Sequence, residues 1–260
     1  MNDREAGKYW DQNADAWTFL ARRGCDVYRD LVNTPCFLDL LPDVRGRLGL
    51  DIGCGEGHNT RLLAARGGRM SAVDISPTFI RHAQNEDDDI RYAVASAQDL
   101  PFPAGAFDFA TAFMSLMDMP DPARALCETA RVLKPGGFLQ FSILHPCFFP
   151  VHRKLLRDSH GQEYAVEIGR YFDHPDVRFE EWLFSAAPAE LKTGLRPFRV
   201  PVFHRTLAEW LNMVFDAGLA VERIAEPRAS EETAARYPSV RDTRVVAYFL
   251  HVRCRKLQPK

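Results

Sequence analysis

The chain has 260 residues, enough for one sizeable α/β domain or for a domain with one insertion. Its 33 basic and 35 acidic side chains give a formal net charge of −2. This balance argues against a general binder of phosphate backbones, which carries a basic face and a high pI. The six cysteines form no C-x-x-C pair, so the sequence suggests neither a zinc ribbon nor a dithiol redox site.

The N-terminal region, residues 3–45, is amphipathic and predicts helices, with an aromatic-rich beginning at Tyr9, Trp10 and Trp17. The first ten residues lack the basic and apolar segments of a secretory leader. No apolar run approaches the roughly 20 residues that span a bilayer. We therefore expect a cytoplasmic protein with no membrane partner.

Strands and helices alternate after this region. The apolar runs that predict strands are 48–52, 70–75, 90–95, 107–114 and 138–144. Two of the helices between them have a clear start, because Ser76-Pro77 and Asp121-Pro122 place a capping side chain before a proline at the first helical position. Lys134-Pro-Gly-Gly137 ends the second of these helices. The alternation with short connections predicts a parallel sheet covered on both faces.

The pattern changes after the fifth strand. Residues 147–203 are rich in aromatics and prolines, and two β-like runs at 178–184 and 198–204 predict an inserted hairpin that could act as a lid. A capping box, Thr206-Leu-Ala-Glu209, opens a further helix. Strands at 219–225 and 244–254 are expected to close the fold as an antiparallel hairpin.

The strongest chemical motif is the loop after the first strand, Asp51-Ile-Gly53-Cys-Gly55-Glu-Gly57. A strand that ends in glycines and leads into a helix leaves backbone N–H groups uncovered, so a ligand can approach closely. Asp74 ends the second strand, where a carboxylate can hold the two hydroxyls of a ribose. Together these features predict a cofactor that contains ribose.

Two residues distinguish the kind of cofactor. The dinucleotide pattern G-x-G-x-x-G, read from Gly53, requires glycine at the position of His58. Asp51 supplies a leading carboxylate, which would attract an ammonium or sulfonium and repel a pyrophosphate. A nicotinamide-dependent dehydrogenase is therefore disfavoured.

The chain resembles the class I, Rossmann-like S-adenosylmethionine-dependent methyltransferases, in particular the type 11 group that acts on small molecules. The loop fits the pattern D-x-G-x-G-x-G at every fixed position. Further motifs follow in the family's order: Ala72-Val-Asp74-Ile-Ser-Pro77, Gln98-Asp-Leu-Pro-Phe102, Phe107-Asp108-Phe109 and Arg131-Val-Leu-Lys-Pro-Gly-Gly137. The resemblance extends over residues 5–145, and over the last two strands in outline.

This resemblance implies an α/β fold with a seven-stranded, mostly parallel sheet and an antiparallel C-terminal hairpin. It implies a single methyltransferase domain with a helical cap at 1–45, a cofactor-binding core at 46–146, an insertion or lid at 147–204, and a C-terminal helix and strands at 205–260. The cofactor would be S-adenosyl-L-methionine, with S-adenosyl-L-homocysteine as the product. No metal site is expected.

The resemblance also implies roles in the part of the site that holds methionine and ribose. Asp51 and the Gly53 backbone would hold the methionine ammonium. Gly55 and Gly57 would allow close packing beneath the cofactor, and Asp74 would bind the ribose hydroxyls.

The adenine and the methionine tail would meet other residues. Ile75 would pack on the adenine, and Ala97 with Gln98 would meet its edge. Met114 and Ser115 would line the methionine tail.

Cys54 and Ser96 complete the expected cofactor site. Members of the family often carry an acid where this chain has Ser96, so the contact to the adenine amino group is expected from Gln98 or Asp99 instead.

Two residues are candidates for moving a proton. His145 follows the fifth strand, at the edge where substrates approach such sheets, so it could take a substrate proton or simply bond to backbone in a proline turn. Asp118 could face the pocket as a base or cap the turn at Pro120. The methyl group of the cofactor is already activated, so catalysis is largely alignment and the catalytic residues are left unassigned.

The favoured function is methylation of a small-molecule acceptor, with no nucleic-acid partner. Two alternatives remain open: methylation of RNA or protein, which predicts a basic rim around the pocket, and non-catalytic binding of S-adenosylmethionine, which predicts a filled acceptor pocket. The sequence leaves the acceptor, the nucleophilic atom and the oligomeric state undecided.

Overall fold

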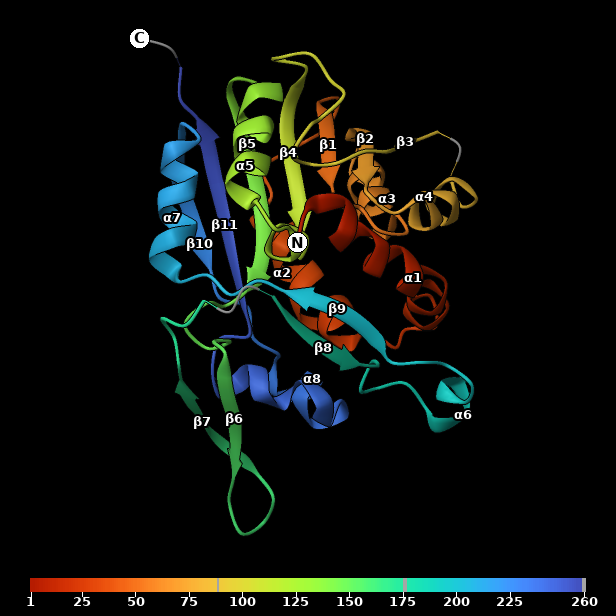
Figure 1. Cartoon of the computed structure of the whole chain (residues 1–260), viewed down its shortest axis with the longest axis vertical. Helices are drawn as coiled ribbons and strands as arrows, with labels where there is room; N and C mark the ends of the chain where they lie inside the picture. Colours follow the sequence, from red (N-terminus) through yellow and green to blue (C-terminus); the bar gives the residue numbers. More distant parts are fainter. Residues whose placement is uncertain (88, 175–176, 259–260) are drawn as a thin grey trace.

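A twisted seven-stranded sheet forms the centre of the molecule, in the strand order β10-β11-β5-β4-β1-β2-β3 (Figure 1). The computed structural model describes residues 1–87, 89–174 and 177–258. The strands of this sheet are β1 (Leu48–Ile52), β2 (Arg69–Asp74), β3 (Arg91–Val94), β4 (Phe107–Phe113), β5 (Leu133–Leu144), β10 (Leu219–Ala225) and β11 (Phe249–Lys256). β11 runs antiparallel to both of its neighbours, and the other neighbouring pairs are parallel. The expected fold class is confirmed.

Helices cover both faces of the sheet. They are α1 (Asp3–Ala21), α2 (Thr34–Leu40), α3 (His58–Ala65), α4 (Pro77–Gln84), α5 (Pro122–Val132), α6 (Ala189–Lys192), α7 (Leu207–Asp216) and α8 (Glu231–Arg236), with a π-helical turn η1 (Arg29–Asn33) and 3-10 turns η2 (Leu116–Asp118) and η3 (Pro238–Arg244). On one face, α5 and α7 pack over β1, β4 and β5, while α2, α3 and α4 pack on the other. Alternate residues of each strand therefore enter different cores, as in doubly wound sheets.

The expected helix starts are present. The Ser76 hydroxyl accepts the Phe79 N–H at 3.1 Å, and the Asp121 carboxylate accepts the Arg124 N–H at 3.0 Å. Thr206 and Glu209 form the reciprocal capping box that opens α7. These caps satisfy N–H groups that a helix otherwise leaves unpaired at its first turn.

Two parts of the main sheet differ from expectation. β5 begins at Leu133 and pairs with β4 from there, where the sequence suggested the end of a helix followed by a turn. The last strand begins at Phe249, and not at position 244, because residues 238–244 form η3. Both differences follow from tertiary packing: Leu133 is fully buried beside β4, and Val240 is fully buried in a separate cluster.

The insertion contains two hairpins instead of one. β8 (Arg178–Trp182) pairs with β9 (Phe198–Val202), close to the two expected runs. β6 (His152–Arg157) and β7 (Glu163–Gly169) form a further hairpin that extends away from the sheet (Figure 1). Sequence reasoning missed β6 and β7 because charged residues are mixed through both strands and the pair joins no large core.

The β8–β9 hairpin and α1 lie across the end of the sheet toward which the arrows of β1 and β4 point (Figure 1). An aromatic cluster joins them: the Trp17 ring lies 4.9 to 5.3 Å from the rings of Trp182, Phe184 and Phe198. Such edge-to-face and tilted contacts stabilise the pairing beyond the apolar area that they bury. The cap and the insertion thus close over the same edge of the sheet.

Across the described residues, the structure contains no helix that combines the length and the apolar character needed to cross a membrane.

Candidate active site

A cavity of about 850 Å³ lies where the carboxyl ends of the parallel strands meet α1, η1 and the β8–β9 hairpin. Its volume is near the upper end of the range for ligand pockets. The predicted cofactor residues that line it are Asp51, Gly53, Cys54, Gly55, Asp74, Ile75, Ala97, Met114 and Ser115. Ligands of open α/β sheets bind at this edge because the loops that follow the strands converge there.

The glycine loop is shaped by backbone conformations that favour glycine. Gly53, Gly55 and Gly57 have φ angles of +68°, +55° and +83°. A Cβ at Gly53 would lie 2.4 Å from the Cβ of Ser115, and one at Gly57 would lie 2.6 Å from the Tyr92 hydroxyl. Gly57 therefore packs beneath the loop, whereas Gly55 faces open space and leaves room at the cavity wall.

Asp51 is buried and held by two hydroxyls. Thr60 donates to one carboxylate oxygen at 2.6 Å and Thr111 donates to the other at 2.8 Å. Burial raises the pKa of Asp51 to about 6 despite these hydrogen bonds, and the charge of Asp74 raises it further. A cationic group bound in the cavity would lower this pKa, so the site favours a ligand that carries positive charge.

Asp74 is oriented by backbone N–H groups. Gly55 and Ser76 each donate to one of its oxygens at 2.9 Å. Because a carboxylate oxygen can accept two hydrogen bonds, both oxygens keep capacity for a ligand diol. Burial raises the pKa of Asp74 to about 6.

These residues fit S-adenosylmethionine. The cavity combines Gly55, beside which the loop leaves open space, with two carboxylates suited to cationic and ribose groups. The indole N–H of Trp10, which lines the cavity, is buried and has no hydrogen-bond partner among the described residues, a condition that a bound ligand can relieve.

The expected adenine-edge residues divide into two groups. Ala97 lines the cavity, but Ser96, Gln98 and Asp99 are not part of its wall. Ser96 and Gln98 instead donate hydrogen bonds to the Asp3 carboxylate of α1, at 3.2 Å for the Gln98 amide. Asp3 itself lines the cavity.

The end of β4 turns sharply toward the cavity. Met114 has a φ of +52°, which is unusual for a residue with a side chain and stores backbone strain. Ser115 donates to the Ile52 carbonyl at 2.6 Å and so ties the end of β4 to the end of β1. The strained turn presents both residues to the cavity, where they were expected.

His145 does not line the cavity, although Leu144 and Pro146 on either side of it do. Its Nδ1 accepts the Cys147 N–H at 3.2 Å, so the proton lies on Nε2 and is donated to Glu226 at 2.9 Å. Burial lowers the pKa of His145. The geometry therefore favours the structural interpretation, in which the histidine anchors its turn.

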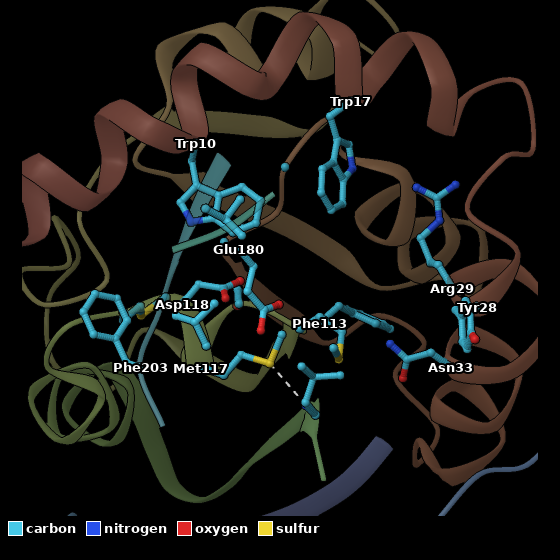
Figure 2. Close-up of a pocket in the computed structure, with 18 of the residues that line it drawn as sticks. Trp10, Trp17, Tyr28, Arg29, Asn33, Phe113, Met117, Asp118, Glu180 and Phe203 are labelled. Carbon is cyan, nitrogen blue, oxygen red and sulfur yellow. Dashed lines mark hydrogen bonds between the residues drawn. The ribbon is translucent and has the colours of Figure 1, made fainter. Parts of the chain in front are cut away.

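Asp118 does line the cavity, and Figure 2 shows its carboxylate beside that of Glu180. Among the described residues, none forms a hydrogen bond with the Asp118 side chain, so it does not cap the turn at Pro120. Burial raises the pKa of Asp118 well above its usual range, the charge of Glu180 adds to this, and Arg205 acts in the opposite direction. When it is ionised, a carboxylate that faces the cavity in this way can accept a proton from an acceptor bound there.

Several residues that line the cavity were not predicted as site residues from the sequence. Among them, Glu180 comes from β8 of the insertion, and Arg29 and Asn33 come from η1. The Asn33 amide is held between His251 at 2.6 Å and Ser142 at 3.3 Å. None of these residues belongs to a motif, so only the convergence of distant segments places them here (Figure 2).

In the described ranges 1–87, 89–174 and 177–258, no three side chains of His, Cys, Asp or Glu come together in a way that suits a metal ion.

Comparison with known proteins identifies the class. Residues 50–141 match the family model described as "Methyltransferase domain". The ubiquinone biosynthesis O-methyltransferase of Xanthomonas oryzae pv. oryzae is 34% identical over 205 residues, which cover 74% of this chain and 81% of that protein. The demethylmenaquinone methyltransferase of Tropheryma whipplei is 38% identical over 116 residues, which cover 42% and 47%. The crystal structure of an S-adenosylmethionine-dependent methyltransferase from Mesorhizobium loti matches with a TM-score of 0.68 and 27% identity, over 85% of this chain and 96% of that one.

The chain therefore belongs to the class I S-adenosylmethionine-dependent methyltransferases. It is an enzyme that uses S-adenosyl-L-methionine as its cofactor and transfers the methyl group to a small-molecule acceptor.

Affinity for S-adenosylhomocysteine is expected to fall as the pH drops below 6. The pKa values of Asp51 and Asp74 in the free protein are both about 6, and the ligand's ammonium and ribose require the charged carboxylates. Each protonated group would then weaken binding by up to about tenfold per pH unit. Calorimetric titrations between about pH 5 and about pH 8 test this, and an affinity that is constant across this range would contradict it.

Titration of Asp51 and Asp74 by itself would not unfold the protein as the pH falls. The pKa of each carboxyl is raised from 3.8 in the unfolded chain to about 6 in the folded one. The contribution of these two groups to stability is therefore present at low pH and is lost as the pH rises from about 4 to about 6. A thermal unfolding curve at each pH serves as the control.

Proposed function

We propose that this enzyme methylates the hydroxyl oxygen of an apolar, aromatic small molecule. The observation that carries the proposal is Asp118, a carboxylate without a hydrogen-bond partner among the described residues, which faces the cavity and has a raised pKa. A phenol gives up its proton only weakly at neutral pH, so its methylation benefits from a nearby base. One relative, the ubiquinone biosynthesis O-methyltransferase, is named for transfer to oxygen.

The cavity wall supports an apolar aromatic acceptor. Aromatic side chains come to it from the cap, from the insertion and from the sheet: Trp10, Trp17, Tyr28, Phe113, Phe149, Trp182, Phe184, Phe203, Trp210, Tyr248 and Phe249. Such rings bind a flat apolar molecule through offset and edge-to-face contacts. This aromatic lining favours a flat apolar molecule over a nucleic acid or a protein as the acceptor.

The cofactor residues are proposed to act as the resemblance implies. Asp51, Gly53, Cys54, Gly55, Gly57, Asp74, Ile75, Ala97, Met114 and Ser115 would hold the cofactor, while Ser96 and Gln98 would act through Asp3. When it is bound, S-adenosylmethionine supplies a methyl group activated by its sulfonium.

The protein itself would align the acceptor with the cofactor, exclude water from the cavity and accept one proton from the acceptor. α1 and the β8–β9 hairpin close the cavity through the aromatic cluster around Trp17, which lowers the local polarity. Asp118 accepts the proton of the acceptor hydroxyl. Burial and the nearby charge of Glu180 raise the pKa of Asp118, which makes it a stronger base when it is ionised. The Arg205 guanidinium, bonded to the Met119 and Pro120 carbonyls, stands near Asp118 and balances the two acids.

The test is an acceptor series in which only the nucleophilic atom changes. Purified protein and S-adenosylmethionine are incubated with para-alkylphenols, the matching anilines and the matching anisoles, and S-adenosylhomocysteine is quantified. We expect turnover with the phenols, a KM that falls as the alkyl chain lengthens, and none with the anisoles. If only the anilines are methylated, the atom that receives the methyl group is nitrogen and the proposal of oxygen is wrong. Tight cofactor binding without turnover on any acceptor would favour the non-catalytic alternative.

The remaining expectations stay predictions. They include the division into a cap at 1–45, a core at 46–146, a lid at 147–204 and a C-terminal part at 205–260, as well as the cytoplasmic location.

A further inference from the structure

The part of the cavity beside Asp74, here called the slot, is lined by the apolar residues Ile75, Phe79 and Ala97 and by Gly7 of α1. A Cβ on Gly7 would lie 2.9 Å from the Ile75 side chain, so α1 is packed directly against this slot. Asp3 also lines the cavity, and its partners Ser96 and Gln98 lie on either side of Ala97 in the sequence, which places its carboxylate at the slot.

The slot is suited to the adenine of the cofactor. With the ribose diol on Asp74, the base attached to that ribose must lie beside the next residue of the chain, Ile75. A purine fills a flat apolar slot well, but its amino group requires a hydrogen-bond acceptor because an unpaired buried donor is costly. The Asp3 carboxylate is a charged acceptor at the slot.

Asp3 is held in place by the loop after β3. The Ser96 hydroxyl donates to one of its oxygens and the Gln98 amide donates to the other. Ser96 also accepts the Gln98 backbone N–H at 3.0 Å, which fixes the hydroxyl itself. Each carboxylate oxygen retains a second lone pair, so Asp3 can accept from a ligand without losing these partners.

We propose that Asp3 of α1 recognises the adenine amino group of the cofactor and is a specificity-determining residue for it. The proposal rests on the cofactor assignment made above. It gives Ser96 and Gln98 a positioning role: they hold the acid that the base meets. Because Asp3 lies on the cap, recognition of adenine requires α1 to be docked on the core.

Other contacts of α1 allow this role to be separated from docking. Asp11 accepts the Ser76 hydroxyl at 2.6 Å and the Thr78 N–H at 2.9 Å, and the exposed Asp15 bonds to His82 at 2.7 Å. Asp15 does not line the cavity. Asp15→Asn is therefore a matched control, since it also neutralises an acid on α1 that contacts the core.

The experiment compares S-adenosylhomocysteine with S-inosylhomocysteine, in which a 6-oxo group replaces the amino group, by calorimetric titration. Wild-type protein should prefer the adenosyl ligand by at least about 100-fold, because a charged acceptor would face the oxo group of its analogue. Asp3→Asn should lower the preference to below about tenfold, since an amide can donate to the oxo group and accept from the amino group. Asp15→Asn should leave the preference unchanged.

A ratio of two affinities measured on one variant does not depend on the fraction of that variant that is folded. The double variant Asp3→Asn with Ser96→Asp should recover the preference, because it returns an acid to a position that contacts residue 3. An unchanged preference in Asp3→Asn would overturn the proposal and leave the methyltransferase assignment intact. Failure of the wild-type protein to bind either ligand would instead overturn the cofactor site on which the proposal rests.

Discussion

Replacement of Asp118 by asparagine is expected to lower kcat for phenolic acceptors by about 10²- to 10⁴-fold, the usual contribution of a general base. Asparagine keeps the shape of the side chain but cannot take the proton of the hydroxyl. Cofactor affinity should change little, because Asp118 lies on η2 and is not among the residues assigned to the cofactor. Steady-state kinetics and a titration with S-adenosylhomocysteine measure the two effects.

Glu180→Gln provides the matched comparison. The charge of Glu180 contributes to the raised pKa of Asp118, so its removal should lower that pKa. The acidic limb of the kcat profile should therefore move to lower pH, while activity on the plateau is retained in part. If Asp118→Asn keeps more than about a tenth of wild-type kcat, Asp118 is not the base, since such a loss is smaller than general-base catalysis contributes.

Asp74→Ala is expected to weaken the binding of S-adenosylhomocysteine by about 10²- to 10⁴-fold. The change removes two charge-assisted hydrogen bonds to the ribose, each of which contributes about 1.5–3 kcal/mol, and it releases the N–H groups of Gly55 and Ser76 that shape the loop. Calorimetric titration with S-adenosylmethionine, S-adenosylhomocysteine and NADH measures the loss and the cofactor class together.

Asp74→Asn is the control for this variant, because its amide oxygen can still accept one backbone N–H. Its affinity should lie between those of wild-type protein and Asp74→Ala. A wild-type affinity in Asp74→Ala would show that the ribose is held elsewhere, and binding of NADH by the wild-type protein would contradict the cofactor assignment.

Features that depend on a few adjacent residues could be predicted before the fold was known. The strand at 48–52, the loop from Gly53 to Gly57 and the cap at Ser76 are each specified by a few adjacent residues, because backbone conformation and capping depend on near neighbours. The order of these local elements is also what made the resemblance to a methyltransferase visible. The β6–β7 hairpin escaped prediction because its strands lack a continuous apolar face.

Contacts between side chains that are distant in the sequence became visible in the folded chain. Asp3 accepts a hydrogen bond from Ser96, 93 residues further along the chain, so Ser96 contacts the helical cap and does not line the cavity. His145 bonds to Glu226, 81 residues further along, which gives the histidine a structural partner. Asp118 and Glu180 face one cavity only because the β8–β9 hairpin folds over the end of β4. Contacts of this kind depend on packing and not on local spacing. The cofactor site could therefore be predicted from its motifs, while the proposed base and the adenine contact required the fold.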